Sequence, residues 1–428
     1  MYILYLFLAL IILLLMVTIH EFGHYVAGKL LGFKINEFSI GFGKSLYSRK
    51  SKKTGEVFSI RLIPLGGYCA FEGEDAEQEQ KEGSFNKMAP WKRIIVLVAG
   101  PLFNILSAVI FSIILLCATG YDIPQVYKID SVPVVNVTQF DTADTDANWD
   151  SVKGIVSIKE YGSTEEPTLL ENQKTGNLSN SIKQYTIAKD QDPTVASYTV
   201  VYYKEDTSVY YTARIDVNFE KNDMLLKDDV IWKINGTSID FGKNNLFANM
   251  IRSAEGDTAV LRVKRNGEYL DVTVNLFKSG VGENSYNAIG VQPVAYRYGF
   301  FEAIGRSVPF TFGLAWKVLE SLWLLITGQL GLEAVGGPIT TIATIASYTQ
   351  TDFATIFILL PLIAANLGVF NLIPIPALDG SKVIFVTIEW IRGKPINPKV
   401  ENMIYTVGFY LLIGLVLIAD IYHFIFVR

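Results

Sequence analysis

The sequence predicts a polytopic α-helical membrane protein with four transmembrane helices, a membrane-associated cytoplasmic β-sheet and an extracytoplasmic β-rich domain. Half of the 428 residues are hydrophobic and 18% are charged, which is more apolar than soluble proteins of this length. The apolar residues gather toward the two ends of the chain, whereas the middle is polar. We therefore expect membrane-embedded parts on both sides of a soluble part.

Four apolar stretches are long enough to cross about 30 Å of hydrocarbon, which takes roughly 20 helical residues. They are Tyr2–Ala27, Ile94–Thr119, Ala354–Leu372 and Met403–Phe426. The first has neither the basic residues before it nor the cleavage site after it that mark a secretory signal, so we interpret it as a retained helix. A fifth stretch, Val308–Leu330, is interrupted by Lys317 and Glu320 and is rich in aromatic residues, which favours an amphipathic helix at the membrane interface.

Basic residues in short loops indicate which side of the membrane each loop faces, because cytoplasmic loops carry an excess of lysine and arginine. The connection between the first two spans is rich in them, and the last connection has Arg392, Lys394 and Lys399. We expect both connections to be cytoplasmic. The polar segment from about Gly120 to Arg306 and both termini are then extracytoplasmic. The net charge of −5 gives no indication of a nucleic-acid partner.

Two polar regions show the alternation of apolar and polar side chains that is typical of strands. In the first cytoplasmic connection the runs are Phe38–Phe42, Val57–Ile63 and Tyr68–Phe71, which predicts a small sheet close to the membrane surface. In the extracytoplasmic segment they are Ser197–Tyr203, Tyr210–Val217, Val230–Ile234, Ala259–Lys264 and Leu270–Asn275. We therefore expect this segment to form a β-rich domain.

His20, Glu21 and His24 belong to an HExxH sequence inside the first apolar stretch. The four-residue spacing puts both imidazoles on one helix face, where they can hold one zinc ion, with Glu21 close enough to act on water at the metal. Chance is the alternative, since histidines also pack in cores and cap helices. However, two of the chain's three histidines occur here, and ionisable residues are rare in membrane helices unless they have a function. The motif therefore predicts a zinc site with Glu21 as its catalytic residue.

A catalytic zinc ion held by two histidines usually has a third protein ligand, often a carboxylate, and one open position. The first and third spans are both expected to run inward, so the end of the third span brings Asp379 to the depth of the two histidines. The alternative is that Asp379 forms a turn or an N-cap before a helix at Ser381–Ile391. Asp420 and His423 lie at the outer end of the fourth span, and we interpret them as interfacial residues and not as ligands.

Five motifs occur in order along the chain. They are HEFGH at His20–His24, PLGGY at Pro64–Tyr68, AGPLFN at Ala99–Asn104, GPI at Gly337–Ile339 and NLIPIPALDG at Asn371–Gly380. Together they resemble the bacterial site-2 proteases of the RseP/RasP type, the intramembrane zinc metalloproteases of peptidase family M50. The resemblance covers all four predicted spans.

The resemblance implies a zinc ion, Zn²⁺, held by His20, His24 and Asp379, with Glu21 as the catalytic residue and Asn371 as a substrate-binding residue. It also implies that the extracytoplasmic domain is PDZ-like, because residues 226–236 are similar to the family's GD-x-I-x-x-I-N-G stretch. The expected partners are single-pass membrane protein substrates and the lipid bilayer.

The sequence departs from the family pattern at three places. Ser381 and Lys382 stand where a second glycine usually follows Asp-Gly, Asp228 precedes Asp229 where the family has glycine, and an apparent insertion spans roughly Thr138–Tyr211. The first position is not a ligand, so the catalytic prediction is unaffected. The other two weaken the PDZ match. Two alternatives stay open for this domain: recognition of peptide termini, or a steric filter or scaffold.

We therefore expect an intramembrane zinc endopeptidase that cleaves transmembrane segments of single-pass membrane proteins, such as pre-trimmed anti-sigma factors or signal-peptide remnants. Its expected location is the bacterial cytoplasmic membrane, with the active site toward the cytoplasm. The alternative is a non-catalytic scaffold or chaperone that binds partners through its PDZ-like domain, against which the intact Glu21 argues. A metal transporter would need polar groups along several spans, which the second and fourth spans lack.

The spans and motifs divide the chain into consecutive regions. Their expected bounds are 1–32 for the first helix with HExxH, 33–93 for the cytoplasmic β-region, 94–119 for the second span, 120–298 for the PDZ-like domain with its insertion, 299–352 for the interfacial helix region, 353–382 for the third span with the LDG motif, 383–402 for the cytoplasmic connection and 403–428 for the fourth span. The membrane regions thus enclose the soluble domain in the sequence.

Overall fold

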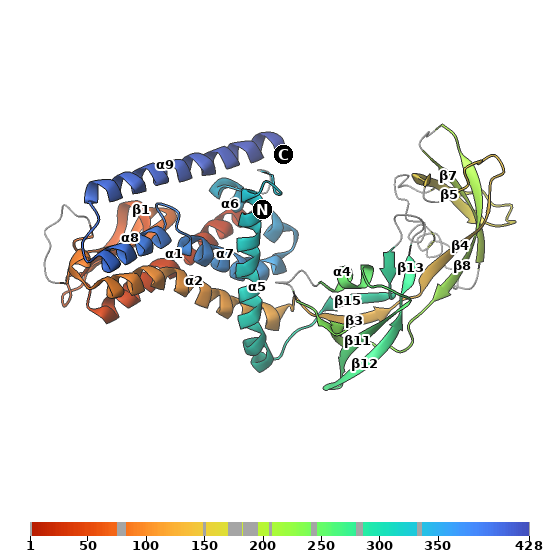
Figure 1. Ribbon diagram of the computed structural model, residues 1–428, viewed down its shortest axis with the longest axis horizontal. Coiled ribbons are helices and arrows are strands. Elements are labelled where there is room, and N and C mark those ends of the chain that lie inside the picture. Colours follow the sequence, from red (N-terminus) through yellow and green to blue (C-terminus); the bar gives the residue numbers. More distant parts are fainter. Residues whose placement is uncertain are drawn as a thin grey trace. The chain divides into compact units, whose positions relative to one another are not determined.

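The computed structural model describes the whole chain except residues 1, 75–82, 149–150, 170–181, 183–195, 205–207, 241–245, 280–285, 332–335 and 428. The chain forms two compact units. The first, here called the membrane unit, contains Met1–Thr119 and Arg297–Arg428, and the second, the outer unit, contains Gly120–Tyr296. In Figure 1 the membrane unit is mostly helical, whereas the outer unit is built mainly from strands.

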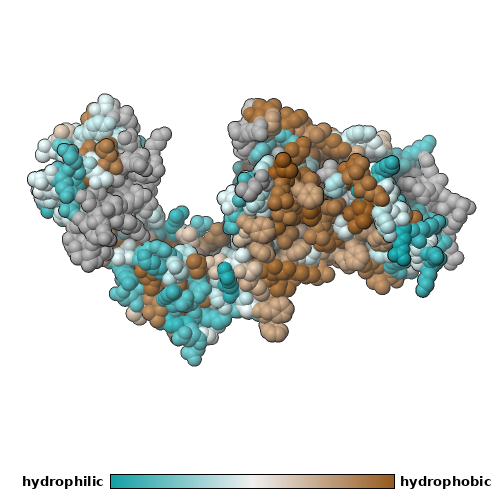
Figure 2. Space-filling view, turned by 180° about the vertical axis from the view of Figure 1, so that it is seen from behind, coloured by the Kyte–Doolittle hydropathy of each residue, from teal (hydrophilic) through white to brown (hydrophobic). Residues whose placement is uncertain are grey.

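The helices of the membrane unit include every predicted span. They are α1 (Tyr2–Leu31), α2 (Pro90–Ala118), α5 (Phe300–Ile326), α6 (Pro338–Thr351), α7 (Ile356–Leu372), α8 (Asp379–Arg392) and α9 (Pro398–Tyr422). Short 3₁₀ turns at Phe85–Lys87 and Phe353–Thr355 precede α2 and α7, and a π-helical turn at His423–Val427 follows α9. Figure 2 shows a broad hydrophobic surface over this unit, as expected for a polytopic membrane protein.

Among the described residues, five helices are long and apolar enough to cross a membrane: α1, α2, α5, α7 with its preceding turn, and α9. The additional one is α5, which contains most of the predicted interfacial stretch. It contacts α2 through a hydrogen bond of 3.0 Å between the hydroxyls of Ser112 and Thr311, and in Figure 1 it runs across the direction of α2 and α9. Length and composition alone do not separate a span from an interfacial helix, so the count of four spans stays a prediction.

The connection between α1 and α2 forms a sheet of two long antiparallel strands, β1 (Ile35–Lys50) and β2 (Val57–Phe71). Residues 37–40 of β1 pair with residues 57–60 of β2 on one side and with residues 67–70 on the other. Residues 67–71 therefore form an outer edge of the sheet. The three short runs predicted here are parts of these two strands, because Gly41 and Gly43, with φ of +88° and +81°, let β1 bend where a strand was expected to end.

A buried apolar cluster joins this sheet to three helices. Its members, which come from α1, α2, α8 and the residues around the two strands, are Ala27, Phe33, Ile35, Phe71, Phe85, Val96, Leu97, Ala99 and Val386. Full burial of one large apolar side chain contributes about 1.5–3 kcal/mol. The cluster therefore fixes the end of β2 against the helices that carry the candidate site.

The first sheet of the outer unit has the strand order β12 (Glu268–Asn275), β11 (Thr258–Arg265), β9 (Val230–Ile234), β3 (Pro124–Ile129) and β15 (Val291–Ala295). Neighbouring strands in it are antiparallel. Three smaller elements accompany it: β10 (Thr237–Ser238) pairs with β9, β13 (Phe277–Ser279) pairs with β14 (Tyr286–Ala288), and the short helix α4 (Phe247–Arg252) contacts β14.

The second sheet comes from the part of the chain between β3 and β9, where the insertion was expected. Its order is β4 (Val132–Phe140), β8 (Tyr211–Glu220), β7 (Ala196–Tyr203), β5 (Gly154–Glu160) and β6 (Thr168–Leu169). Buried side chains that include Ile155, Ile158, Tyr198, Val200, Ile215 and Val217 form a cluster on it. The second sheet therefore has a hydrophobic core of its own.

Candidate metal centre and active site

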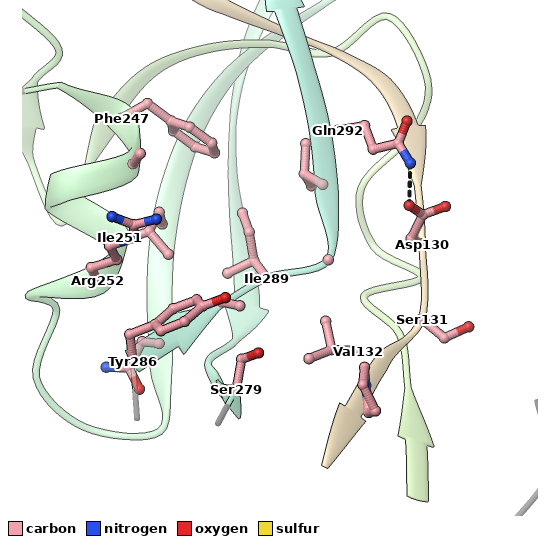
Figure 3. Close-up of a pocket in the computed structure, with 16 residues that line it drawn as sticks. Asp130, Ser131, Val132, Phe247, Ile251, Arg252, Ser279, Tyr286, Ile289 and Gln292 are labelled. Atoms are coloured by element: carbon pink, nitrogen blue, oxygen red, sulfur yellow. Dashed lines mark hydrogen bonds between the residues drawn. The ribbon is translucent and has the colours of Figure 1, made fainter. Parts of the chain in front are cut away.

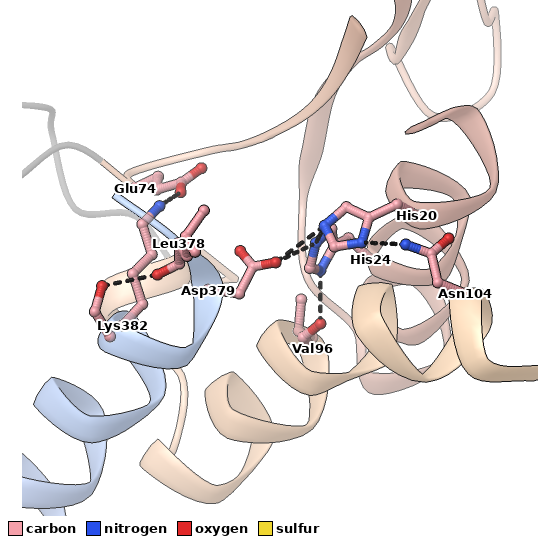
Figure 4. A network of polar contacts seen from close by, with 9 residues as sticks. His20, His24, Glu74, Val96, Asn104, Leu378, Asp379 and Lys382 are labelled. Carbon is pink, nitrogen blue, oxygen red and sulfur yellow. Dashed lines mark hydrogen bonds and ion pairs between the residues drawn. The ribbon is translucent and has the colours of Figure 1, made fainter. Parts of the chain in front are cut away.

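Two histidines and one aspartate converge inside the membrane unit. His20 Nε2 lies 3.0 Å and His24 Nε2 lies 3.4 Å from Asp379 Oδ2, and the two Nε2 atoms are 3.2 Å apart. Both histidines are only 7% exposed, so the cluster is largely shielded from solvent. Figure 4 shows the carboxylate of Asp379 directed at both imidazoles.

Two glycines let helix α2 approach the face of α1 that carries the histidines. A Cβ on Gly23 would lie 2.5 Å from the carbonyl oxygen of Ala99, and a Cβ on Gly100 would lie 2.3 Å from His24 Nε2. Any larger residue at these positions would push the helices apart. Glycine therefore allows α2 to pack directly against the imidazoles.

Asp379 is the first residue of α8. The N-cap of this helix is Leu378, whose side chain makes no capping hydrogen bond, so the structure does not use Asp379 as the N-cap that the sequence left open. The chain reaches Asp379 through Ala377, which has a φ of +80°. This left-handed conformation is uncommon for a residue with a side chain, and such conformations cluster at functional sites. The turn delivers the carboxylate to the histidines.

The three side chains fit a zinc ion. Two imidazole nitrogens and one carboxylate oxygen are a common ligand set of catalytic zinc sites. Ligand atoms about 2.0–2.1 Å from a tetrahedral zinc ion are roughly 3.3–3.4 Å apart, close to the separations of 3.0–3.4 Å found here. Within the described parts of the chain, this is also the one group of histidine, cysteine or acidic side chains whose ligand atoms converge, all within 4.8 Å of one another.

Helix α2 also contacts the second nitrogen of each imidazole. His24 Nδ1 lies 2.8 Å from the carbonyl oxygen of Val96, and His20 Nδ1 lies 3.1 Å from Asn104 Nδ2. Asn104 is fully buried. Sequence analysis did not identify it as a site residue, although it ends the AGPLFN motif. A polar amide inside a membrane helix is the signal that could have identified it.

Glu21 lies near the histidines and next to the sheet edge formed by residues 67–71. Its carboxylate interacts with the backbone of Cys69, and a Cβ on Gly67 would lie 3.7 Å from Glu21 Cγ. Because Gly67 has no side chain, the backbone of this edge strand comes close to the carboxylate. The structure therefore places an ionisable group between the three converging residues and an extended segment of backbone.

Asn371, the remaining predicted site residue, lies in the last turn of α7. None of the contacts found among the described residues joins it to the histidines or to Asp379, so its role stays a prediction. One turn after Asp379, Lys382 forms an ion pair of 2.7 Å with Glu74, which is also drawn in Figure 4. This pair ties α8 to the segment that follows β2, at a position where the chain departs from the family pattern.

The outer unit contains a cavity of its own, with a volume of about 240 Å³. It lies between α4, the segment from β14 to β15 and the residues that lead into β4. Figure 3 shows Phe247 and Ile251 at one side of the view and Ser131 and Val132 at the other, with Ile289 between them. Arg252 and Tyr286 add polar groups to the lining. None of the three converging residues lines this cavity.

The chain is similar to known proteases over most of its length. The model of the family described as Peptidase family M50 matches residues 8–415. The chain is 27% identical to the Regulator of sigma E protease of Haemophilus influenzae over 438 residues, covering 94% of this chain and 95% of that protein. It is 28% identical to the Regulator of sigma-E protease RseP of Escherichia coli, with 95% of each chain covered. It is 29% identical to a protein of Vibrio cholerae named as a zinc metalloprotease, with 96% of this chain and 97% of that protein covered.

These matches confirm the predicted family, the predicted enzyme class and the predicted cofactor. The family model spans α1, α2, α7 and α8, which position the converging residues. The chain therefore belongs to peptidase family M50 and is a zinc metalloprotease with several membrane-compatible helices.

Proposed function

We propose that the protein is an intramembrane endopeptidase of the site-2 type, which cleaves transmembrane segments of single-pass membrane proteins at a zinc ion held by His20, His24 and Asp379. The observation that carries this proposal is the depth of the ligand set, because both histidines lie within an apolar helix long enough to cross a membrane. A peptide bond that reaches these residues must itself lie in or next to the bilayer.

The catalytic step follows from the residues around the ligand set. Bound there, zinc lowers the pKa of water toward about 7 and stabilises the charge that develops on the scissile carbonyl. Glu21 takes the proton from the attacking water and then delivers it to the leaving amine. Val96 and Asn104 hold the two imidazoles in place from α2. Residues of this protein thus supply the zinc ligands, the group that carries the proton and the contacts that orient the two imidazoles.

The substrate has to be unwound locally, because the carbonyl groups of a transmembrane helix are engaged in hydrogen bonds within the helix. We assign the binding of the unwound segment to the sheet edge formed by residues 67–71. Among the described residues this edge pairs with β1 on one side only, and it lies next to Glu21. An extended substrate segment that adds to this edge as a further strand brings its peptide bonds to the proton carrier.

Asn371 is assigned a supporting role in substrate binding. Its amide can donate to a carbonyl group and accept from an N–H group, and both kinds of group are set free when a helix unwinds. Its place at the end of α7, shortly before Asp379, supports this assignment.

The proposed location is the bacterial cytoplasmic membrane, with the active site on its cytoplasmic side and the outer unit outside. The basic residues of the β1–β2 region and of the connection between α8 and α9 support this orientation. Helix α5 is assigned to the membrane interface, because its large exposed apolar side chains recur every three or four residues and so form one stripe. After the exposed Phe300 at the helix start, these side chains are Phe301, Ile304, Val308, Phe312, Trp316, Leu319, Trp323 and Ile326.

The outer unit is assigned to substrate selection. Its first sheet, with α4 beside it, is the part that resembles a PDZ domain, and the cavity between α4 and the segment from β14 to β15 is large enough for one or two side chains. A unit of this kind selects substrates by binding a peptide end or by excluding bulky extracytoplasmic domains. Both modes favour proteins that have already been shortened outside the membrane.

The proposal is tested by co-expressing the protein with single-pass membrane proteins that have been shortened outside, and by mapping the cut with mass spectrometry. We expect cleavage within or next to the transmembrane segment, and no cleavage with Glu21→Gln. A cut far outside the membrane, or equal cleavage with both forms, would contradict the proposal.

A further inference from the structure

One face of helix α2 lies along the two histidines. Val96, Gly100 and Asn104 are spaced by four residues, so they share this face. Val96 meets His24 Nδ1, Gly100 leaves room for the ring of His24, and Asn104 meets His20 Nδ1. The imidazoles face Asp379 through Nε2, and α2 therefore controls the nitrogen on the opposite side of each ring.

The protonation of Nδ1 decides whether Nε2 can bind a metal. A neutral imidazole carries one proton, so a lone pair on Nε2 requires the proton to be on Nδ1. For His24 this is settled by the backbone, because the carbonyl oxygen of Val96 can only accept a hydrogen bond. For His20 the partner is a side-chain amide, which has a donating and an accepting end.

The amide of Asn104 has a single described partner. Its nitrogen faces His20 Nδ1 and its oxygen, which is buried, has no hydrogen-bond partner among the described residues. The two ends of such an amide are nearly indistinguishable in shape, and their assignment is an inference from the hydrogen bonds around them. The protonation of His20 therefore decides which end of the amide faces it.

We propose that Asn104 is a positioning residue whose amide oxygen accepts the Nδ1–H of His20, so that the Nε2 lone pair of His20 is directed at zinc. This inference rests on the proposed ligand set. A donating amide would leave the proton on Nε2, where it blocks the metal. Outer partners of this kind fix the orientation of a metal-binding histidine and raise its basicity. The two histidines are thus positioned differently: His24 by backbone, which no substitution removes, and His20 by a side chain.

Two substitutions of similar size separate the accepting role from the donating one. Asn104→Asp keeps oxygen atoms that accept, whereas Asn104→Leu removes all hydrogen bonding. We expect zinc affinity, measured by competition with a chelator, to fall about 10–100-fold in Asn104→Leu and to be retained or increased in Asn104→Asp. Ser107→Ala is the control, because the buried Ser107 hydroxyl donates to the backbone of Asn104 and contacts neither imidazole. Its zinc affinity is expected to equal that of the wild type.

A spectroscopic measurement detects the proposed hydrogen bond between His20 and Asn104 directly. The chain has three histidines, so ¹⁵N-histidine labelling in a His423→Gln background leaves only the two imidazoles of the site. In the zinc-loaded protein, the Nδ1–H of His20 should exchange slowly with solvent in the wild type and in Asn104→Asp, and quickly in Asn104→Leu.

Three results would overturn the inference: unchanged zinc affinity in Asn104→Leu, an equal loss in Asn104→Asp and Asn104→Leu, or a fast-exchanging Nδ1–H of His20 in the wild type. The last measurement needs no variant at position 104, so the inference stays testable if Asn104→Leu fails to fold. Failure of the ligand set is recognised separately, because His20→Ala would then keep its zinc.

Discussion

In the membrane unit the buried imidazoles of α1 and the buried amide of Asn104 on α2 meet at one place, whereas in the outer unit the buried carboxylates lie in separate ion pairs and hydrogen bonds. His20, His24 and Asn104 lie in one contact network with Asp379. In the outer unit, Asp144 and Asp229 are also buried, but each has its own partners in its own sheet. The comparison teaches that buried polar groups indicate chemistry where several of them converge on one point, and indicate structure where each has partners of its own.

The partners in the outer unit explain why its polar groups are structural. Asp144 accepts hydrogen bonds from the Tyr202 hydroxyl at 2.5 Å and from Lys204 Nζ at 2.6 Å. Burial by itself would raise the pKa of Asp144, but these hydrogen bonds outweigh it and hold the pKa below its ordinary value. Asp229 accepts two hydrogen bonds of 2.7 Å from Arg265. Both carboxylates thus tie loops to strands.

The largest effect is expected from Asp379→Ala. It removes one of three ligands, so zinc affinity should fall by more than the roughly 10–100-fold that loss of an outer partner costs, and proteolysis should disappear. Metal analysis of the purified protein gives the answer. Asp420→Ala is a matched control, because Asp420 is a carboxylate on α9 that binds the start of α6 and not the histidines. Full zinc occupancy in Asp379→Ala would remove this residue from the ligand set.

Removal of the outer unit should change the choice of substrate and leave the chemistry intact. The ends of the unit lie side by side, since a Cβ on Gly120 would be 2.1 Å from the carbonyl oxygen of Tyr296. A short Gly/Ser linker can therefore replace Gly120–Tyr296. We expect this protein to bind zinc, to cleave a substrate already shortened outside, and to accept unshortened substrates that the full chain rejects.

A correctly inserted, zinc-loaded deletion protein that cleaves no substrate would contradict the assignment of selection to the outer unit. The outer unit would then contribute to catalysis, and the contrast between a catalytic membrane unit and a structural outer unit would no longer hold.

The smallest effect is expected from Asp144→Asn, which should destabilise the second sheet by about 1–3 kcal/mol and leave zinc content and cleavage unchanged. Hydrogen–deuterium exchange of peptides from β5 and β7 in the full-length protein checks this. The pKa of Asp144 is lowered in the folded state, so its contribution is present at neutral pH and is lost as the pH falls through and below about 3.9, the ordinary value. In Asp144→Asn this acid-dependent part of the stability should be absent. Loss of zinc in this variant would show that the units are not independent.

Sequence reasoning was effective where a residue type is out of place. Two histidines and a glutamate in an apolar helix are rare without a function, so the HExxH motif and a nearby carboxylate could be predicted. Asn104 was missed, because one neutral amide in an apolar run is a weaker signal than a charged or metal-binding side chain. In the outer unit, the alternation of apolar and polar side chains predicted a strand at Val230–Ile234, and β9 has the same bounds.

Other elements depend on contacts that the local sequence does not contain. Helix α6 contains many threonine and isoleucine residues, which are mediocre helix formers, and the sequence did not single it out. Its first turn is capped from α9, where Asp420 accepts hydrogen bonds from the backbone N–H groups of Ile339 and Thr340. This cap gives Asp420 a role that the sequence did not indicate, because the carboxylate joins two helices.

In the proposed mechanism Glu21 carries the proton and does not hold the metal. The most direct test measures zinc content and substrate cleavage together on purified Glu21→Gln and wild-type protein, with His20→Ala as the variant that should lose both. Glutamine keeps the size of the side chain but cannot take a proton from water. We predict normal zinc content in Glu21→Gln and a fall in cleavage of at least about 10²–10⁴-fold, the contribution of general-base catalysis. Near-normal cleavage by Glu21→Gln would contradict the account.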